Sequence, residues 1–210
     1  MTLIPPIVHG AWVRPGGGTF PDQVKARGWG VDQFFWDATD PATDHPKRLA
    51  GVLEDMRRAG WKVGITRDPQ WDGYSHPVGW YGAKLSQDIT DLGCDGKQCS
   101  AILDAEIHDS DRVLAELKSF RAKRSGRFLY WTMEPKQGGI MSDELIAWIN
   151  QDPLTWVVIQ KYRGRMQPVS ERAVIDDLRA RGLRDDKILV YYERYEEGFE
   201  GIIFDIANAA

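Results

Sequence analysis

The regular alternation of helical and strand-like segments is the feature that most constrains the fold of this chain. Four amphipathic helices are each followed by a turn residue and then by a run rich in β-branched and aromatic residues. In the first helix, apolar residues recur at i, i+3, i+4 and i+7. The spacing predicts helices over 45–59, from Ser110 to the turn at Gly126, over 142–150 and over 170–181, with Ser110 and Ser170 as N-caps. The strands that follow are WKVGIT, RFLYWT, LTWVVIQ and KILVYY.

Four further strand-like runs complete the pattern: IVHGAW, VDQFFWDA, SAILDAE and GIIFDIA. A weaker helix, 80–92, precedes SAILDAE. Strands that alternate with helices pair in parallel through right-handed crossovers. We therefore predict an α/β protein whose residues 1–210 form a single domain, a (β/α)8 barrel of the TIM type. An open doubly wound sheet is the alternative, but no glycine-rich phosphate loop begins a helix.

The last two strands depart from this pattern. About six residues, 195–200, separate them, whereas a parallel crossover needs about a dozen or more. We therefore expect the barrel to be degenerate there, with a hairpin in place of a βα unit.

Composition excludes several classes of function. The chain has 210 residues and a net charge of −4, and its lysines and arginines are dispersed, which argues against nucleic acid as a partner. No apolar run approaches the ~18–20 residues of a membrane span, and the N-terminus does not resemble a signal peptide, so we expect synthesis in the cytoplasm. Cys94 and Cys99 are too few for a tetrahedral zinc site and are interpreted as two thiols, with a small disulfide loop as the alternative. No cofactor is expected.

Polar side chains recur where the predicted strands end. In a parallel barrel the chemistry lies at the carboxyl ends of the strands, so these positions are the candidate site. Each of them has an alternative interpretation as a solvated rim residue or a structural ion pair. The residues are His9, Asp37, Arg67, Asp68, Asp104, Glu106, Glu134, Gln160, Tyr162, Glu193 and Asp205.

Asp104 and Glu106 form the most informative pair. Residues two apart on a strand share a face, with roughly 6.5–7 Å between their Cα atoms. Two carboxylates that close repel each other, so that one can act as an acid beside an anionic partner, as glycoside hydrolysis requires. An ion pair with Arg67 and oxygen ligation of a hard cation are the alternatives.

Aromatic residues near the same strand ends suggest a sugar site. The segment DPQWDGYSHPVGWYG contains Trp71 and follows the third strand, and Trp36 and Trp131 lie near neighbouring strand ends. Aromatic faces pack on the apolar faces of sugar rings. We therefore assign substrate binding to Trp36, Trp71 and the polar strand-end residues Asp37, Arg67, Glu134, Gln160, Tyr162 and Glu193. A small apolar cluster under a long loop is the alternative.

The motifs LDAE, KLSQDITDLG, VVIQKY and the final FD resemble those of glycoside hydrolase family 25, the lysozyme-like muramidases often carried by bacteriophages. The resemblance implies that Glu106 is the proton donor, Asp104 the assisting carboxylate and Asp205 a last-strand aspartate lining the same cleft. It also implies cleavage of the β-1,4 bond of peptidoglycan, with cell-wall glycan as the partner.

The sequence departs from that family at its first strand. IVHGAWV offers His9 where the family has a strand-end aspartate, and the nearest substitute, Asp37, lies one strand later. Chitinase-like barrels share the D-x-E ending but lack a match at Ile102 and Cys99. The departures leave a second hypothesis, a non-catalytic tail-tip or minor tail protein that uses the barrel as a scaffold or glycan-binding head. It would be associated with the virion and with phage tail proteins.

Overall fold

Eight strands close into a barrel in sequence order. The computed structural model describes residues 8–13, 26–28, 30–31, 33–37, 53–94, 100–134, 141–161, 170–194 and 202–209. Its strands are β1 (Val8–Val13), β2 (Gln33–Asp37), β3 (Lys62–Arg67), β4 (Ala101–Asp104), β5 (Leu129–Met133), β6 (Thr155–Lys161), β7 (Ile188–Arg194) and β8 (Ile202–Asn208). The predicted (β/α)8 barrel of the TIM type is thus confirmed.

The last strand runs against its neighbours. Strands β1 to β7 pair in parallel, whereas β8 is antiparallel to both β7 and β1. The expected degeneracy at the last two strands is therefore confirmed. The carboxyl ends of β1 to β7 all lie at one end of the barrel, which we call the mouth, and β8 begins there.

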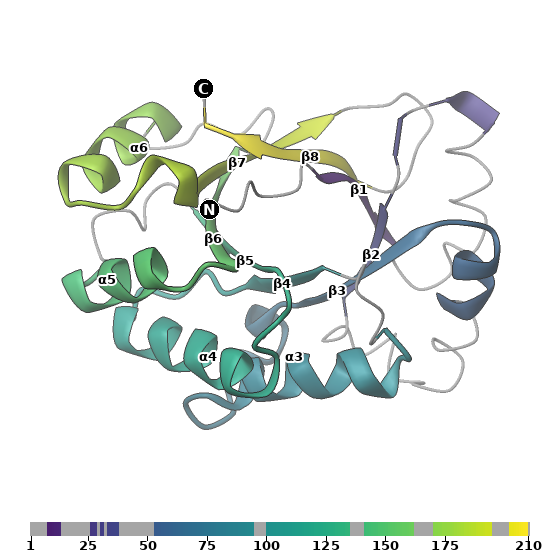
Figure 1. Cartoon of the computed structure of the whole chain (residues 1–210), viewed down its shortest axis with the longest axis horizontal. Coiled ribbons are helices and arrows are strands. Elements are labelled where there is room, and N and C mark those ends of the chain that lie inside the picture. The colour runs from purple at the N-terminus through teal and green to yellow at the C-terminus, as the bar shows by residue number, and fades with distance from the viewer. Residues whose placement is uncertain are drawn as a thin grey trace.

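Within the described residues, the four labelled helices follow strands β3 to β6 in turn. They are α3 (Trp80–Asp91), α4 (Ser110–Lys123), α5 (Asp143–Gln151) and α6 (Glu171–Ala180), with short 3-10 turns η2 (Pro69–Asp72) and η4 (Asp185–Lys187). Helix α3 packs on β3 and β4, α4 lies between α3 and α5, and α5 and α6 contact β6 (Figure 1). Of the predicted helix 45–59, residues 53–58 are described and are helical. None of the helices in the described ranges combines the length and the apolar character that crossing a membrane requires.

One of the two predicted N-caps, Ser170, is confirmed. Ser142 and Ser170 accept hydrogen bonds from backbone N–H groups three residues ahead, as N-caps do. Helix α4 differs, because Asp109 caps it by accepting from the Arg112 N–H. The predicted cap, Ser110, is instead the first helical residue, and its hydroxyl bonds Ser142 at the start of α5.

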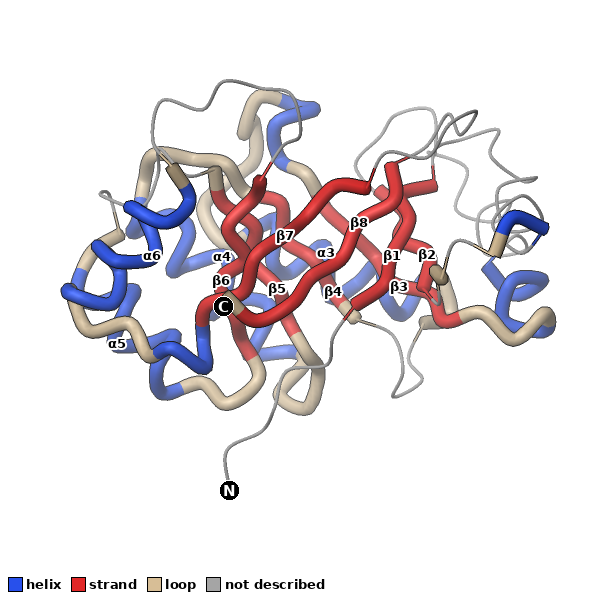
Figure 2. Tube along the Cα trace, turned by 90° about the horizontal axis from the view of Figure 1, so that it is seen from above, coloured by secondary structure: helices blue, strands red, loops and turns tan. Residues whose placement is uncertain are grey.

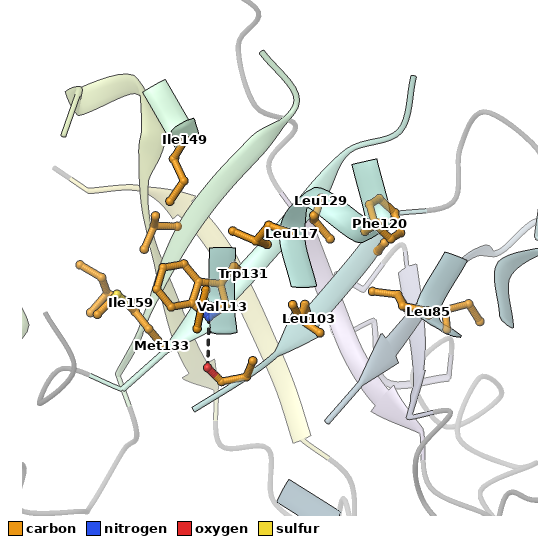
Figure 3. Packing of buried hydrophobic residues seen from close by; sticks show 14 of the residues in the cluster. Leu85, Leu103, Val113, Leu117, Phe120, Leu129, Trp131, Met133, Ile149 and Ile159 are labelled. Atoms are coloured by element: carbon orange, nitrogen blue, oxygen red, sulfur yellow. Dashed lines mark hydrogen bonds between the residues drawn. The ribbon is translucent and has the colours of Figure 1, made fainter. Parts of the chain in front are cut away.

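Two apolar layers hold the barrel together. Outward-facing strand residues pack under the helices, where Leu103, Leu117 and Trp131 belong to one buried cluster (Figure 3). Inward-facing residues fill the barrel itself. This inner cluster consists of Val8, Phe35, Ile102, Tyr130, Trp156, Val158, Leu189, Tyr191, Phe204 and Ile206.

Two glycines make room for the largest rings of the inner cluster. A Cβ on Gly10 would lie 2.5 Å from the Phe204 ring, and one on Gly64 would lie 2.3 Å from the Phe35 ring. Because side chains alternate along a strand, Gly10 also identifies the inward face of β1, which it shares with Val8 and Trp12. The interior is therefore packed with side chains, and the chemistry must take place at its ends.

Candidate active site

Asp104 lies at the end of β4 on the strand face that points into the barrel. Ile102, two residues earlier on that face, is fully buried in the inner cluster. One oxygen of Asp104, Oδ1, accepts hydrogen bonds from the Thr132 hydroxyl on β5 and from Gln160 Nε2 on β6, the latter at 2.9 Å. Three adjacent strands thus meet at this carboxylate. Two donors to one oxygen favour the anionic form of the group.

Glu106 follows two residues later, just outside the strand. Strand β4 ends at Asp104, two residues sooner than the run SAILDAE suggested. Ala105 between the two acids is buried, and its carbonyl accepts a 3.1 Å hydrogen bond from Trp131 Nε1 (Figure 3). This bond holds the backbone from which the partly exposed Glu106 side chain extends. Trp131 itself is buried in the outer cluster, so it is not the cleft residue that its position near a strand end suggested.

The phenol of Tyr74 lies within electrostatic reach of both acids. Burial raises its pKa most, and the negative charges of Asp68, Glu106 and Asp104 raise it further. The two carboxylates therefore act on the same ring, and the phenol stays protonated. Tyr74 has φ 59°, a left-handed conformation that costs a non-glycine residue roughly 1 kcal/mol or more.

Helix α4 holds the loop that carries Tyr74. Arg112 donates hydrogen bonds to the carbonyls of Tyr74 at 3.1 Å and His76 at 2.7 Å, and its guanidinium lies 5.5 Å from the centre of the Tyr74 ring. Glu116, one turn further along α4, accepts the Gly79 N–H at 2.8 Å. The strained turn is thus fixed by groups on a neighbouring helix.

Two more acids belong to the mouth. Glu193 follows Tyr191 on the inward face of β7, and Glu134 comes directly after β5. Both side chains are partly buried. Burial raises the pKa of Tyr191 well above its usual value, and Glu193 and Asp104 raise it further. Of the predicted site residues, Asp104 and Gln160 are thus in hydrogen-bond contact, and Glu106, Glu134 and Glu193 lie at the same end of the barrel.

Arg67 does not belong to this group. It faces outward, since Thr66 takes the inward position at the end of β3, and it is buried beneath α3. Its Nε donates to Asp88 Oδ2 at 2.8 Å, and its guanidinium lies 5.6 Å from the centre of the Trp80 ring. The substrate-binding role predicted for Arg67 is therefore not supported: it is a structural ion pair between strand and helix.

Asp205 faces the outside of the barrel. Its neighbours Phe204 and Ile206 are fully buried in the inner cluster, so the aspartate between them points away from it. His9 Nδ1 lies 2.7 Å from Asp205 Oδ1, and Arg194 Nε lies 3.1 Å from Oδ2. Asp205 thus does not line the same cleft as Asp104. His9 is also not a strand-end residue, because β1 continues to Val13.

Four predicted binding residues cannot be placed at side-chain level. Trp36 and Asp37 end β2, and Trp71 lies in η2, but their side chains are outside the described part of the structure. Tyr162 lies wholly outside the described residues. Their assignment to substrate binding remains a prediction.

The predicted site omitted three inward-facing residues that the structure places at or next to the mouth. They are Thr132, which bonds Asp104, and Trp12 and Tyr191, which bond each other at 3.1 Å. Each follows an inward-facing residue by two positions, so the period of two along a strand is the signal that could have found them.

A metal centre finds no support in the described part of the chain, where no group of three or more His, Cys, Asp or Glu side chains could hold an ion. Cys94 is buried beside Arg57, whose Nη2 lies 3.5 Å from its Sγ, and Cys99 is outside the described residues.

Comparisons with known proteins add little to this geometry. No protein-family model matches the sequence, and no curated protein is significantly similar to it, so the resemblance to family 25 and a phage origin gain no support. One similar solved structure is a GH5 xyloglucan-specific endo-β-1,4-glucanase from a metagenomic library, in complex with cellotriose. It is 11% identical with a TM-score of 0.45, over 80% of this chain and 64% of that one. The chain thus spans less than two thirds of that enzyme, and a likeness this distant assigns no chemistry.

Proposed function

We propose that this protein is a glycoside hydrolase that cleaves the β-1,4 bonds of peptidoglycan. The observation that carries the proposal is the arrangement of Asp104 and Glu106 at the mouth. Asp104 is oriented by donors from two neighbouring strands, and Glu106 extends from the backbone two residues further. Two carboxyl groups in different environments are what glycoside hydrolysis needs. Peptidoglycan as the substrate rests on the LDAE, VVIQKY and FD motifs alone.

The two acids take different roles in the proposed reaction. Asp104, with two hydrogen-bond donors, takes the role of the anion, and Glu106 takes the role of the acid. Glu106 gives its proton to the glycosidic oxygen, and the bond from that oxygen to the anomeric carbon breaks. Asp104 stabilises the positive charge that develops on the sugar. A water then adds to the anomeric carbon, and its proton returns to Glu106.

Replacing Glu106 tests the proposal directly. The Glu106→Gln variant should lose at least about a hundredfold of the rate at which purified cell walls release reducing ends, because glutamine cannot donate the proton. Its Tm should stay close to that of the wild type. Glu144→Gln is the matched control, since Glu144 lies on α5 and pairs with Lys118 on the surface. Wild-type protein that releases no reducing ends between pH 4 and 8 would reject hydrolysis.

A non-catalytic role is the second candidate, and one observation favours it. The family resemblance placed three carboxylates in the cleft, but Asp205 faces the outside of the barrel. The barrel would then serve as a glycan-binding head or scaffold in a virion, assembled with phage tail proteins. Glycan affinity that survives in Glu106→Gln, together with an inactive wild type, is the outcome that selects this role.

A further inference from the structure

The mouth of the barrel has an apolar side opposite Asp104. Trp12 lies one residue before the end of β1, on the inward face that Gly10 identifies. Its register partner on β8 is Ile202. Both side chains are only partly buried, and both pack on the inner cluster. Strands β8 and β4 are four places apart in the closed ring and lie on opposite sides of the barrel (Figure 1), so Ile202 on β8 lies across the mouth from Asp104. Strand β1 runs beside β8 (Figure 2), and Trp12 is therefore next to Ile202.

Within the inner cluster, the Trp12 ring is in the layer nearest the mouth. Its centroid lies 5.4 Å from that of Phe204 and 6.0 Å from that of Phe35. Those two rings are fully buried, whereas Trp12 keeps part of its surface in contact with solvent. The remaining exposure therefore lies on the side away from the packed interior, toward the mouth.

A hydrogen bond fixes the plane of this ring. Trp12 Nε1 donates to the Tyr191 hydroxyl at 3.1 Å, and Tyr191 is almost fully buried on the inward face of β7. The polar edge of the indole is thus directed to the protein, and the ring is held in one orientation without help from a ligand. A preordered aromatic ring loses little conformational entropy on binding.

We propose that Trp12 is the sugar-stacking residue of the mouth and binds the apolar face of a pyranose unit. A pyranose has an apolar face and a rim of hydroxyl groups, which matches an indole on one side of the mouth and carboxylates on the other. The inference rests on the proposed function for the site, but the binding that it describes needs no catalysis. The ligand class is a β-1,4-linked oligosaccharide.

Calorimetric titration of the full chain with chitotetraose and cellotetraose tests the assignment. These probes share the β-1,4 backbone and differ in the 2-acetamido group. In a Glu106→Gln background, Trp12→Leu should weaken binding by about tenfold, because leucine keeps apolar bulk but lacks a flat aromatic face. Trp12→Phe should stay within about threefold of the parent protein. Trp148→Leu is the matched control and should change nothing, since Trp148 packs on the outer cluster. The Tm of each variant confirms that it is folded.

The results separate this inference from the proposed hydrolysis. An active wild type whose affinity is the same in Trp12→Leu removes the inference and leaves hydrolysis standing. An inactive wild type whose affinity falls in Trp12→Leu supports the role of Trp12 and rejects hydrolysis. Failure of both oligosaccharides to bind the folded protein at millimolar concentration overturns the role of Trp12.

Discussion

Asp104 owes its orientation to side chains on the next two strands. Thr132 and Gln160 both donate to Asp104 Oδ1, and both donors are almost fully buried. A buried donor that is held by the surrounding structure stabilises a charge without having to reorganise during the reaction. Thr132 is the simpler of the two to test, because valine has nearly its shape and lacks the hydroxyl.

In Thr132→Val we expect kcat on cell-wall glycan to fall by about tenfold, with little change in KM. The reason is that Asp104 loses one of the two hydrogen bonds that hold it as an anion. Thr132→Ser keeps the hydroxyl and should recover most of the rate. Steady-state kinetics of the two variants provide the measurement, and equal kcat values for valine and threonine would contradict this role.

Lys187 is a buried cation at the opposite end of the barrel. Only 3% of it is exposed, and its Nζ donates to the carbonyls of Asp152 and Thr155 and lies 5.0 Å from the centre of the Trp156 ring. Burial lowers the pKa of Lys187 to about 8, although Asp152 and Asp186 act in the other direction. The folded protein therefore releases this proton more readily than the unfolded chain.

Between pH 8 and 10, the unfolded chain binds more protons at Lys187 than the folded chain does. The free energy of unfolding should therefore rise with pH in this window by up to about 1.4 kcal/mol per pH unit from this group. Urea denaturation of the wild type and of Lys187→Met at pH 7.5, 8.5 and 9.5 measures the effect. The stability difference between the two should change in favour of the wild type as pH increases, and a constant difference would show that Lys187 does not titrate in this way.

At the scale of elements, helices α3 and α4 pack so closely that their backbones nearly touch near Gly82. Glu116 on α4 accepts the N–H groups of Gly79 and Gly82, each at 2.8 Å, and so caps the first turn of α3. Burial raises the pKa of Glu116, and these backbone hydrogen bonds lower it in part. Glycine at position 82 allows the two helices to approach this closely, because a Cβ there would lie 1.9 Å from the Glu116 carbonyl oxygen.

Gly82→Ala sets two effects against each other. Alanine favours a helix over glycine by about 1 kcal/mol, but the clash with the backbone of α4 must separate the helices. We expect the clash to dominate and the free energy of unfolding to fall by more than about 2 kcal/mol. Gly126→Ala is the control, since a Cβ there meets nothing within 4 Å. Thermal denaturation compares the two, and a higher Tm for Gly82→Ala would show that the helices can move apart at little cost.

At the scale of the whole molecule, β8 closes the barrel by running against both neighbours. Its Phe204 ring enters the interior across from Gly10 on β1 and packs on Phe35 and Tyr191. Closure therefore depends on the large Phe204 ring, which occupies the space that a side chain at Gly10 would need. The same antiparallel register pairs His9 with Asp205 on the outer face.

We expect Gly10→Ala to lower the free energy of unfolding by about 1–3 kcal/mol through overpacking against Phe204. Phe204→Leu should relieve part of this loss, so that the double variant is more stable than the sum of the single changes predicts. Combining Gly10→Ala with Phe120→Leu, a change in the outer cluster, should give additive losses. Urea denaturation of the set measures the coupling, and additive losses in both pairs would mean that Gly10 and Phe204 do not meet.

The order of helices and strands, the barrel and the reversal of its last strand follow from local patterns. Helical periodicity, capping serines and a connection near 195–200 too short for a crossover are properties of neighbouring residues, so they can be read along the chain. The placement of Asp104 and Glu106 at the end of a strand is local in the same sense. The exact end of β4 and the cap of α4 are not, because they depend on the hydrogen bonds that Ala105 and Ser110 make with other elements.

Closure of the barrel decided which side chains line the mouth. Alternation along a strand establishes that Arg67 and Thr66, or Asp205 and Phe204, face opposite ways, but not which of them faces inward. That choice depends on which side chains fill the interior together, and the rings of Phe35 and Phe204 beside Gly64 and Gly10 decide it. Arg67 and Asp205 consequently face outward, while Trp12 and Thr132 face inward near the mouth, because packing in a closed barrel is a property of all its strands at once.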